Sequence, residues 1–434
     1  SLSGLVVDQN KKPLPNVNIT ISHTSLGTTT NAKGKFEITN LAVGSYTLTF
    51  SIMGHDTKQI EANVVANRIT EIRTVSLPEK SEQLNEVVVK GHHNKYAVKI
   101  PSSSLRLKTE VAKLPQNIQI ISSELLQDQQ ATSIMDGVIR NVSGVTMLEH
   151  WGNFARVNMR GFRLPAFRNG FNVQDSWGPL SEDMAFVDQI EFVKGPAGFM
   201  MSAGEPGGFY NVVTKKPTEK TIRQVSFMAG SFDNYRATLD LGGKATENGK
   251  LLYRFNAMYQ TSDSHRGNED AERYGFAPAL TYKLSQKTSV TAELNVQQAE
   301  SYMGAAYVFA PNDDGYGSLD RDFKFTDNNY PASDIQEVTF FGTIKHDFNK
   351  DWSWETKFGS LRYDQVGNST WVWSLEENGD AVRYISNWDA LSVGKYFQSY
   401  ISGAFNTGGI THKLLGGFDY SQKEYWADFN QFAI

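Results

Sequence analysis

Cysteine is absent from this chain of 434 residues, and histidine is rare. The lack of cysteine excludes disulfides, thiol catalysis and cysteine metal sites. No run of 18 apolar residues occurs, which excludes a transmembrane helix but leaves open a membrane protein built from alternating strands. The formal net charge of -5 gives no sign of a nucleic-acid partner. No signal peptide is visible at Ser1, so we expect the mature form of an exported protein.

A catalytic constellation is missing as well. The pair His92-His93 lies in a predicted linker, and no histidine is combined with a spaced carboxylate in a helical motif. Simple solvation is one interpretation of that pair, and metal binding is the alternative. The acidic loop from Ala310 to Phe325 lacks EF-hand spacing, so we expect a solvated loop. The chain is therefore predicted not to be an enzyme, with no catalytic residues, no metal site and no cofactor of its own.

Strand patterns dominate what the chain does contain, beginning with residues 1–78. GLVVDQNKKPLPNVNITI predicts two strands around a proline turn, and TTTNAKGKFEITNL predicts another pair around Gly34. VGSYTLTFSIMG then alternates apolar and polar residues with a period of two. Closely spaced turns of this kind favour a small β-sandwich.

Residues 95–217 mix short helices with strands and predict a compact α/β domain. We expect a strand at Ile118 to Ile121, followed by a helix that starts at Ser122 or Ser123, with Glu124 and Gln127 in capping range. A second helix is predicted from Ser133 to Arg140. About 120 residues of this kind can bury a core of their own.

The end of that domain, Ile190 to Pro217, contains five glycines between two strand-like flanks. Glycine adopts backbone conformations that other residues resist, so the segment predicts strand, tight glycine loop, strand. Neither GxGxxG nor GxxxxGK[ST] occurs in it, and a simple phosphate loop does not fit. Phe199 and Met200 are expected near the exposed tip of the loop.

Residues 218–434 change to long alternating strands, as in NYRATLDLGG and LLYRFNAMYQ. Short turns such as ATENGK and FNKDW connect strands on one side. Longer polar segments, about 300–333 and 366–393, are predicted to connect them on the other side. Short turns at one rim and long loops at the other are typical of a transmembrane β-barrel, and a soluble sandwich is the alternative.

The motifs together resemble a known family. GPA, GEPGG and NVVTKKP in the glycine segment, LPQNIQII with NVSGV, and MRGF at Met159 to Phe162 are similar to the plug domain of TonB-dependent outer-membrane receptors of the siderophore branch. Residues 1–78 resemble the carboxypeptidase-regulatory-like domain that precedes many such receptors in the Bacteroidetes, a name that implies no peptidase. The resemblance implies a mainly β fold: a sandwich, an α/β plug and an antiparallel barrel.

The linker, residues 79–94, contains LNEVVVKG, whose three adjacent valines favour an extended backbone. Its position and sequence resemble the TonB box, which an energy-transducing partner binds by strand addition. An ordinary edge strand is the alternative. The resemblance therefore assigns TonB binding to six residues, namely Leu84, Asn85, Glu86, Val87, Val88 and Val89.

Barrel length is where the chain departs from that family, whose members have about 22 strands. Residues 218–434 suffice for roughly nine or ten strands, too few to surround a plug of this size. We therefore expect only the N-terminal part of a longer receptor.

The function implied by the resemblance is active import of ferric siderophores through the outer membrane. The N-terminal domain would lie in the periplasm, a TonB-type protein would pull on the TonB box, and the iron would travel within the ligand. Alternatives are uptake of an oligosaccharide, haem or a vitamin, and a surface adhesin or assembly component built on the same barrel.

Ligand contacts are expected where plug loops point outward beneath the barrel loops. Aromatic faces bury planar ligand groups, and arginine donates to anionic oxygens in a fork. Packing within the plug, barrel-wall salt bridges and a membrane-boundary girdle are the alternatives for individual side chains. The candidates are Trp151, Phe154, Arg163, Phe167, Arg168, Trp177, Phe199 and Met200 in the plug, and Tyr302, Tyr307, Trp371 and Trp373 in the barrel.

Overall fold

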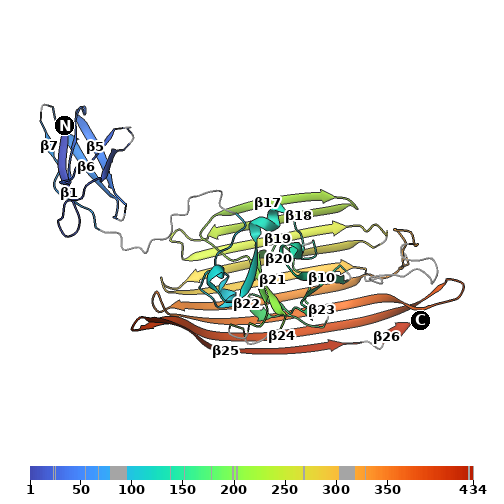
Figure 1. Cartoon of the computed structure of the whole chain (residues 1–434). Helices are drawn as coiled ribbons and strands as arrows, with labels where there is room; N and C mark the ends of the chain where they lie inside the picture. Colours follow the sequence, from blue (N-terminus) through green and yellow to red (C-terminus); the bar gives the residue numbers. More distant parts are fainter. Residues whose placement is uncertain are drawn as a thin grey trace. The chain divides into compact units, whose positions relative to one another are not determined.

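The computed structural model divides the chain into two compact units, Ser1–His92 and His93–Ile434 (Figure 1). It describes residues 1–22, 24, 26–53, 55–66, 68–78, 95–136, 138–150, 152–176, 178–197, 200–201, 204–266, 269–302, 318–327, 329–428 and 431–433. Of the expected elements, the TonB-box-like segment lies outside these described residues. Among them, no helix is long and apolar enough to cross a membrane.

The first unit is a β-sandwich, as the sequence predicts. One sheet has the order β4-β1-β7 with β8 also paired to β1, and the other has the order β3-β2-β5-β6. Strands β2 and β4 alternate exposed and buried residues, so each contributes one face to a shared core that includes Ile19, Phe36, Leu48 and Phe50. The strands are β1 (Leu2–Val7), β2 (Asn18–Ile21), β3 (Gly27–Thr29), β4 (Lys35–Ile38), β5 (Gly44–Ser51), β6 (Lys58–Val64), β7 (Thr70–Glu71) and β8 (Val75–Ser76).

The plug consists of two small sheets with little helix. A five-stranded sheet has the order β14-β13-β16-β15-β9, and a three-stranded sheet has the order β10-β11-β12. The strands are β9 (Asn117–Ser122), β10 (Val145–His150), β11 (Phe154–Met159), β12 (Phe162–Arg163), β13 (Ala166–Arg168), β14 (Phe171–Asn172), β15 (Val187–Lys194) and β16 (Gly208–Thr214). The helical elements are η1 (Ser103–Leu105), η2 (Val111–Lys113), α1 (Ser123–Asp128) and η3 (Val138–Asn141).

The two predicted plug helices have different outcomes. The first is confirmed as α1, whose cap Ser122 accepts a hydrogen bond from the Leu125 amide. The second, predicted from Ser133 to Arg140, is wrong. The Asp136 carboxylate accepts hydrogen bonds from the Thr132 and Ser133 amides, which folds the chain into a turn, and only the 3-10 helix η3 follows.

The glycine segment folds as predicted, into two antiparallel strands, β15 and β16, joined by a loop. Gly208 shows why glycine is needed: its φ is +118°, and an added Cβ would lie 2.0 Å from the Val193 carbonyl oxygen. The predicted exposed tip is wrong for Met200, which is 2% exposed and packs with Val193 and Phe209. Phe199 lies outside the described residues.

The barrel region is one antiparallel sheet in which each strand pairs with the next in sequence (Figure 1). Strand β26 (Gln431–Ala433) pairs with β24. The remaining strands are β17 (Ile222–Gly230), β18 (Asn234–Lys244), β19 (Leu251–Ser262), β20 (Ala271–Lys283), β21 (Thr288–Ser301), β22 (Ser333–Asp347), β23 (Ser353–Leu375), β24 (Ala381–Thr407) and β25 (Ile410–Ala427).

The two rims of this sheet differ, as expected, but one predicted loop is wrong. Residues 302–332 do connect β21 and β22 over a long distance in sequence. The segment 366–393, in contrast, is the outer part of the β23–β24 hairpin, and its turn spans only residues 376–380. Gly379 has a φ of +90° in that turn, and tryptophan and β-branched residues continue the strands on both sides.

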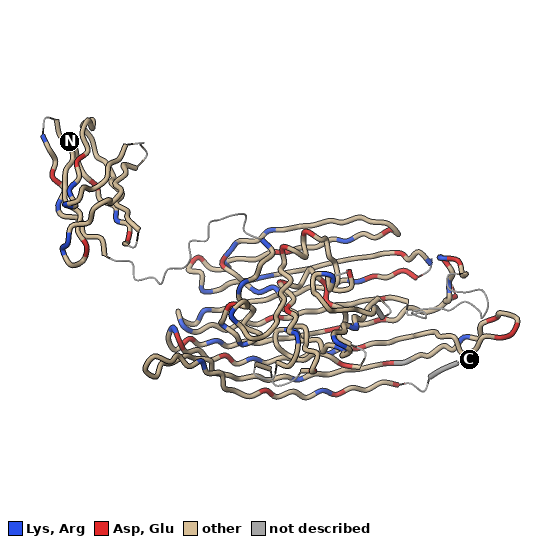
Figure 2. The backbone as a smooth tube through the Cα atoms, viewed as in Figure 1, with Lys and Arg blue, Asp and Glu red and all other residues tan. Residues whose placement is uncertain are grey.

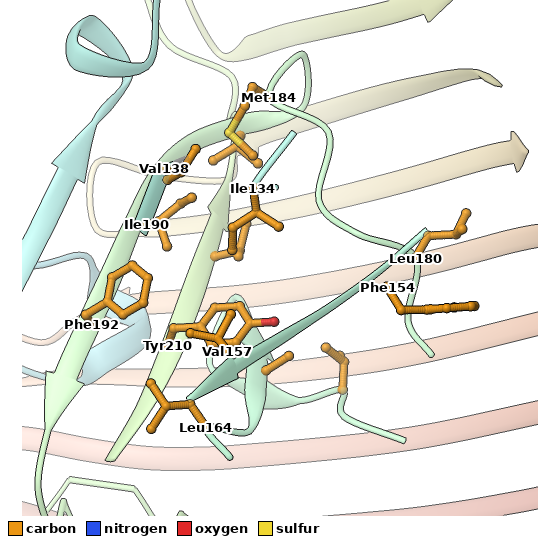
Figure 3. Packing of buried hydrophobic residues seen from close by; sticks show 14 of the residues in the cluster. Ile134, Val138, Phe154, Val157, Leu164, Leu180, Met184, Ile190, Phe192 and Tyr210 are labelled. Carbon is orange, nitrogen blue, oxygen red and sulfur yellow. The ribbon is translucent and has the colours of Figure 1, made fainter. Parts of the chain in front are cut away.

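The plug core packs against the barrel sheet. Ile134, Val157, Ile190 and Phe192 belong to one buried apolar cluster (Figure 3). Barrel residues join the same cluster, among them Ile335, Phe341, Leu361 and Tyr363. The Phe171 ring of the plug stacks on the Phe341 ring of β22 with centroids 5.5 Å apart.

Candidate functional site

A small pocket lies on the plug between strand β11, strand β12 and the loop that precedes β15. The side chains that give it chemical character are Phe154, Arg156, Arg163, Gln174, Glu182 and Tyr210. Two arginines, one carboxylate, one phenol and one aromatic face therefore meet at a single place. Such a mixture can bind a ligand that carries both planar and anionic groups.

The two arginines share one face of the three-stranded sheet. Asn158 of β11 is paired with Arg163 of β12, and residues two apart in a strand point to the same side, so Arg156 joins them. Arg163 remains exposed, but partial desolvation and the neighbouring Arg156 lower the pKa of its guanidinium group. No hydrogen bond or ion pair of the Arg163 side chain is found within the described part of the chain. An anion placed here would relieve the repulsion between the two guanidinium groups.

Tyr210 contributes a hydroxyl group from the base of the pocket. Its ring stacks on Phe192 with centroids 5.9 Å apart, and Figure 3 shows the hydroxyl directed towards the side where Phe154 and Leu180 lie. Burial and the Glu182 carboxylate raise the pKa of Tyr210, so the phenol stays protonated at neutral pH. It is a hydrogen-bond donor suited to an anionic or carbonyl oxygen.

Arg168 lies behind the pocket and joins the plug to the barrel wall. Its Nε donates to Glu182 Oε1 at 2.9 Å, and its guanidinium donates to Glu337 Oε1 of β22 at 2.6 Å. Glu337 Oε2 in turn accepts the Leu180 amide at 2.9 Å. Burial alone lowers the pKa of Arg168, but the two carboxylates outweigh it and raise the pKa. The guanidinium is thus already occupied by protein carboxylates.

The loop that precedes β15 contacts two further barrel strands through polar groups. Asp183 binds the guanidinium of Arg236 on β18 in bidentate fashion, at 2.6 and 2.9 Å. Arg273 on β20 donates to the Ser181 carbonyl at 2.7 Å. Charged residues of both signs occur along the barrel strands and in the plug (Figure 2). The plug is therefore held on the wall by ionic contacts as well as by its apolar core.

The structure brings together only part of the set that the sequence predicts. Phe154 and Arg163 line the pocket, and Arg168 contacts it through Glu182. Phe167 is 2% exposed, packs on Phe209 at 4.6 Å between ring centroids and shares an apolar cluster with Met200. Neither Phe167 nor Met200 faces open space.

The described barrel candidates lie at the rim where residues 302–332 connect β21 and β22. Tyr302 is half-buried directly after β21, and Trp371 is half-buried on the β23–β24 hairpin. Trp373 is 60% exposed, and its ring lies 5.9 Å from the Tyr384 ring. Four candidates lie outside the described residues, together with Leu84 to Val89: these are Trp151, Trp177, Phe199 and Tyr307.

Four of these polar pocket residues were not predicted from the sequence: Arg156, Gln174, Glu182 and Tyr210. A signal for Arg156 was present, because the alternation of ARVNM places it on the same face as Asn158. No local pattern marks Glu182 or Tyr210. Glu182 lies in the loop before β15 and Tyr210 lies on β16, and both reach the pocket only when these parts of the chain pack beside β11.

Comparison with known domains matches two regions of the chain. Residues 110–209 match the TonB-dependent Receptor Plug Domain, and residues 2–89 match the CarboxypepD_reg-like domain. The match over residues 2–89 includes the sandwich strands β1 to β8, and the match over residues 110–209 includes the plug strands β9 to β15.

Known relatives are receptors for metal chelates. The chain is 31% identical over 341 residues to the metal-pseudopaline receptor CntO of Pseudomonas aeruginosa, covering 75% of this chain and 46% of that protein. It is 25% identical over 342 residues to the ferrioxamine B receptor of Salmonella typhimurium, with coverage of 75% and 48%. The chain thus spans about half the length of the curated relatives that it matches.

Solved structures share the fold. The ferripyoverdine receptor of the outer membrane of Pseudomonas aeruginosa, bound to ferripyoverdine, superimposes with a TM-score of 0.70 at 22% identity, covering 82% of this chain and 48% of that one. The open form of the ferric-catecholate import receptor Fiu from E. coli gives a TM-score of 0.65 at 21% identity, with coverage of 75% and 52%.

Proposed function

The chain belongs to the TonB-dependent outer-membrane receptors, and from this membership we propose that it imports metal-loaded siderophores. Members of this family are transporters, so no bond of the ligand is made or broken by the protein. The receptors named for metal-pseudopaline and for ferrioxamine B support a chelated metal as cargo. The metal enters within its chelator, as substrate.

The pocket at Arg156, Arg163 and Tyr210 carries the proposal. Two adjacent guanidinium groups and a protonated phenol suit the anionic oxygens that chelate a ferric ion, and Phe154 offers an aromatic face beside them. Of the candidates from the sequence, Phe154 and Arg163 belong to this contact set. Tyr302, Trp371 and Trp373, at the rim above, are proposed as contacts during ligand entry.

Energy is proposed to come from a TonB-type partner that binds Leu84 to Val89 by strand addition. Pulling on this segment would displace part of the plug and open a path along the barrel wall. Deletion of Leu84 to Gly91 from the full-length receptor is expected to abolish energy-dependent uptake and to leave ligand binding at the cell surface intact. Uptake that survives the deletion would contradict this mechanism.

Binding of a panel of iron-loaded chelators to the full-length receptor tests the cargo. We expect a chelate with anionic oxygens to bind, and Arg156→Ala and Arg163→Ala each to weaken its binding by about tenfold or more, as for loss of a charge-assisted hydrogen bond. Arg140→Ala, in a plug arginine outside the pocket, is the matched control. Equal binding by all three variants would exclude this pocket, and binding of an uncharged oligosaccharide alone would favour glycan uptake.

A further inference from the structure

We infer that Glu191 is a positioning residue that holds the first turn of the plug, Ser102–Leu105, onto the central strand β15 until the plug is pulled. We call this segment the Ser102 turn. The inference rests on the proposed function, because it identifies the contact that must break when force arrives from the N-terminal side. It differs from the wall contacts of Arg168, since Glu191 acts within the plug.

The Glu191 carboxylate has an unusual set of partners. It is 0% exposed and accepts hydrogen bonds from the Ser102 amide at 2.5 Å, the Ser102 hydroxyl at 3.0 Å, Asn211 at 2.8 Å and Gln189 at 2.8 Å. No cation pairs with it within the part of the chain that the structure describes. A buried charge satisfied only by neutral donors depends on every one of them.

Ser102 provides two of these four donors and also begins the turn. Its hydroxyl oxygen accepts the Ser104 amide at 3.2 Å, which caps the 3-10 helix η1. Leu105, at the end of the turn, is fully buried beside Val193 and Phe209. The end of the turn is anchored separately, since Arg106 pairs with Asp419 of β25 at 2.6 Å. Glu191 therefore holds the beginning of the turn and the barrel wall holds its end.

The contact continues to the barrel wall on the other side. Asn211, which donates to Glu191, accepts the Gly170 amide at 2.9 Å. The Gly170 carbonyl accepts a hydrogen bond from Gln398 of β24 at 2.8 Å. Gly170 also touches the turn itself, because an added Cβ would lie 2.9 Å from the Ser104 carbonyl oxygen. A continuous row of buried hydrogen bonds thus connects Ser102 with the wall.

This row passes close to the ligand pocket. Gly170 is two residues from Arg168, whose partner Glu182 lines the pocket. A ligand that shifts Glu182 or Arg168 would move the Asn169–Gly170 corner and with it the donor Asn211. Withdrawal of Ser102 removes two of four donors from Glu191 in one step, so release of the turn is expected to be all-or-none.

Amide hydrogen exchange in the full-length receptor tests this role without any ligand. We expect Glu191→Ala to increase exchange of the peptide containing Ser102–Leu105 by about tenfold or more, because several buried hydrogen bonds are lost together. Peptides from β22 should be unchanged. Glu124→Gln, which neutralises an exposed plug carboxylate at the start of α1, is the matched control. Unchanged exchange at the turn in a folded Glu191→Ala receptor would overturn the inference.

Two further variants keep the test decisive if Glu191→Ala does not fold. Glu191→Gln retains an acceptor for the Ser102 amide and should give a smaller increase in the same direction. Gly170→Ala should also increase exchange at the turn, since its Cβ meets the Ser104 carbonyl and its φ of +88° disfavours alanine. If the turn in both variants exchanged as slowly as in the unmodified receptor, the role of Glu191 would be refuted. If the variants exchange faster but the unmodified receptor takes up no siderophore, the role of Glu191 stands and only the proposed function is refuted.

Discussion

Two plug segments, Leu180–Met184 and the Ser102 turn, are both fixed by buried carboxylates, but with opposite kinds of partner. In the first segment, Asp183 pairs with the Arg236 guanidinium, and the Leu180 amide shares Glu337 with Arg168. In the second, Glu191 is satisfied only by neutral donors. Charge pairs join this part of the plug to strands β18 and β22, whereas neutral hydrogen bonds hold the beginning of the Ser102 turn, whose end is followed by the Arg106–Asp419 pair.

This difference has a mechanical consequence. A buried ion pair that loses one partner leaves an uncompensated charge, which makes separation costly. The two neutral donors that Ser102 provides leave Glu191 together, and water can replace them without the separation of two opposite charges. We therefore expect the beginning of the Ser102 turn, which lies closer in sequence to the predicted TonB box, to be released more readily than Leu180–Met184.

The largest expected effect is on the charge pairs. Arg168→Ala leaves the buried Glu182 and Glu337 without their shared cation, and we expect it to destabilise the folded receptor by about 3–5 kcal/mol. Thermal unfolding of the purified full-length receptor in detergent measures this change. Arg140→Ala is the control in the same domain. An unchanged unfolding temperature for Arg168→Ala would show that the pair is not an anchor.

A smaller effect is expected at the turn. Ser102→Ala removes the hydroxyl that donates to Glu191 and caps η1, but it keeps the backbone amide as a donor. The expected loss is about 1–2 kcal/mol of local stability, as for one buried hydrogen bond and a cap. Hydrogen exchange of the turn peptide measures it. Ser123→Ala, next to the cap of α1, serves as control, and a loss as large as that of Arg168→Ala would contradict the comparison.

The smallest effect is expected at the exposed attachment that precedes the turn. Lys95 and the Tyr96 hydroxyl both bind the Asp128 carboxylate, and these hydrogen bonds lower its pKa from 3.8. A lowered carboxylate pKa stabilises above the unfolded value and is lost as the pH falls through the folded one. Tyr96 has a pKa raised from 10.0 by the same contact, so its contribution disappears as the pH rises past that raised value.

Exchange of the Tyr96 peptide should therefore be slowest between about pH 4 and pH 10, after correction for intrinsic rates. Tyr96→Phe should remove part of that protection and leave the Ser102 turn unchanged, because Asp128 is exposed and its contacts are screened by solvent. A turn that loosens in Tyr96→Phe would show that the two attachments act as one.

The fold was largely predictable because its signals are local. Period-two alternation in β18 and β19, the serine cap of α1 and the glycines around β15 and β16 each fix a backbone conformation over a few residues. Predictions were wrong where a side chain changed the local outcome. Asp136 folds a predicted helix into a turn, and residues 366–393 continue as paired strands because β23 and β24 supply partners for each other along that whole length.

The candidate site was less predictable, and Arg168 shows the reason. Its sequence context RLPAFRNGF suggests a loop arginine open to a ligand, yet its guanidinium binds a glutamate 169 residues further along the chain. Met200 and Phe167 suggested exposed contacts by residue type and are packed in the core of the plug. Arg163, at the end of a short strand, kept the exposure that the sequence implied.

The sequence by itself determined the kinds of domain, the order in which they occur and the family, because periodicity, caps and glycine turns depend on near neighbours. Tertiary structure alone decided which charged residues line the pocket and which bind the barrel wall. That choice depends on partners such as Glu337 for Arg168 and Ser102 for Glu191, which come from distant parts of the chain. Burial of a charge is tolerated only where such a partner arrives, and no local pattern announces it.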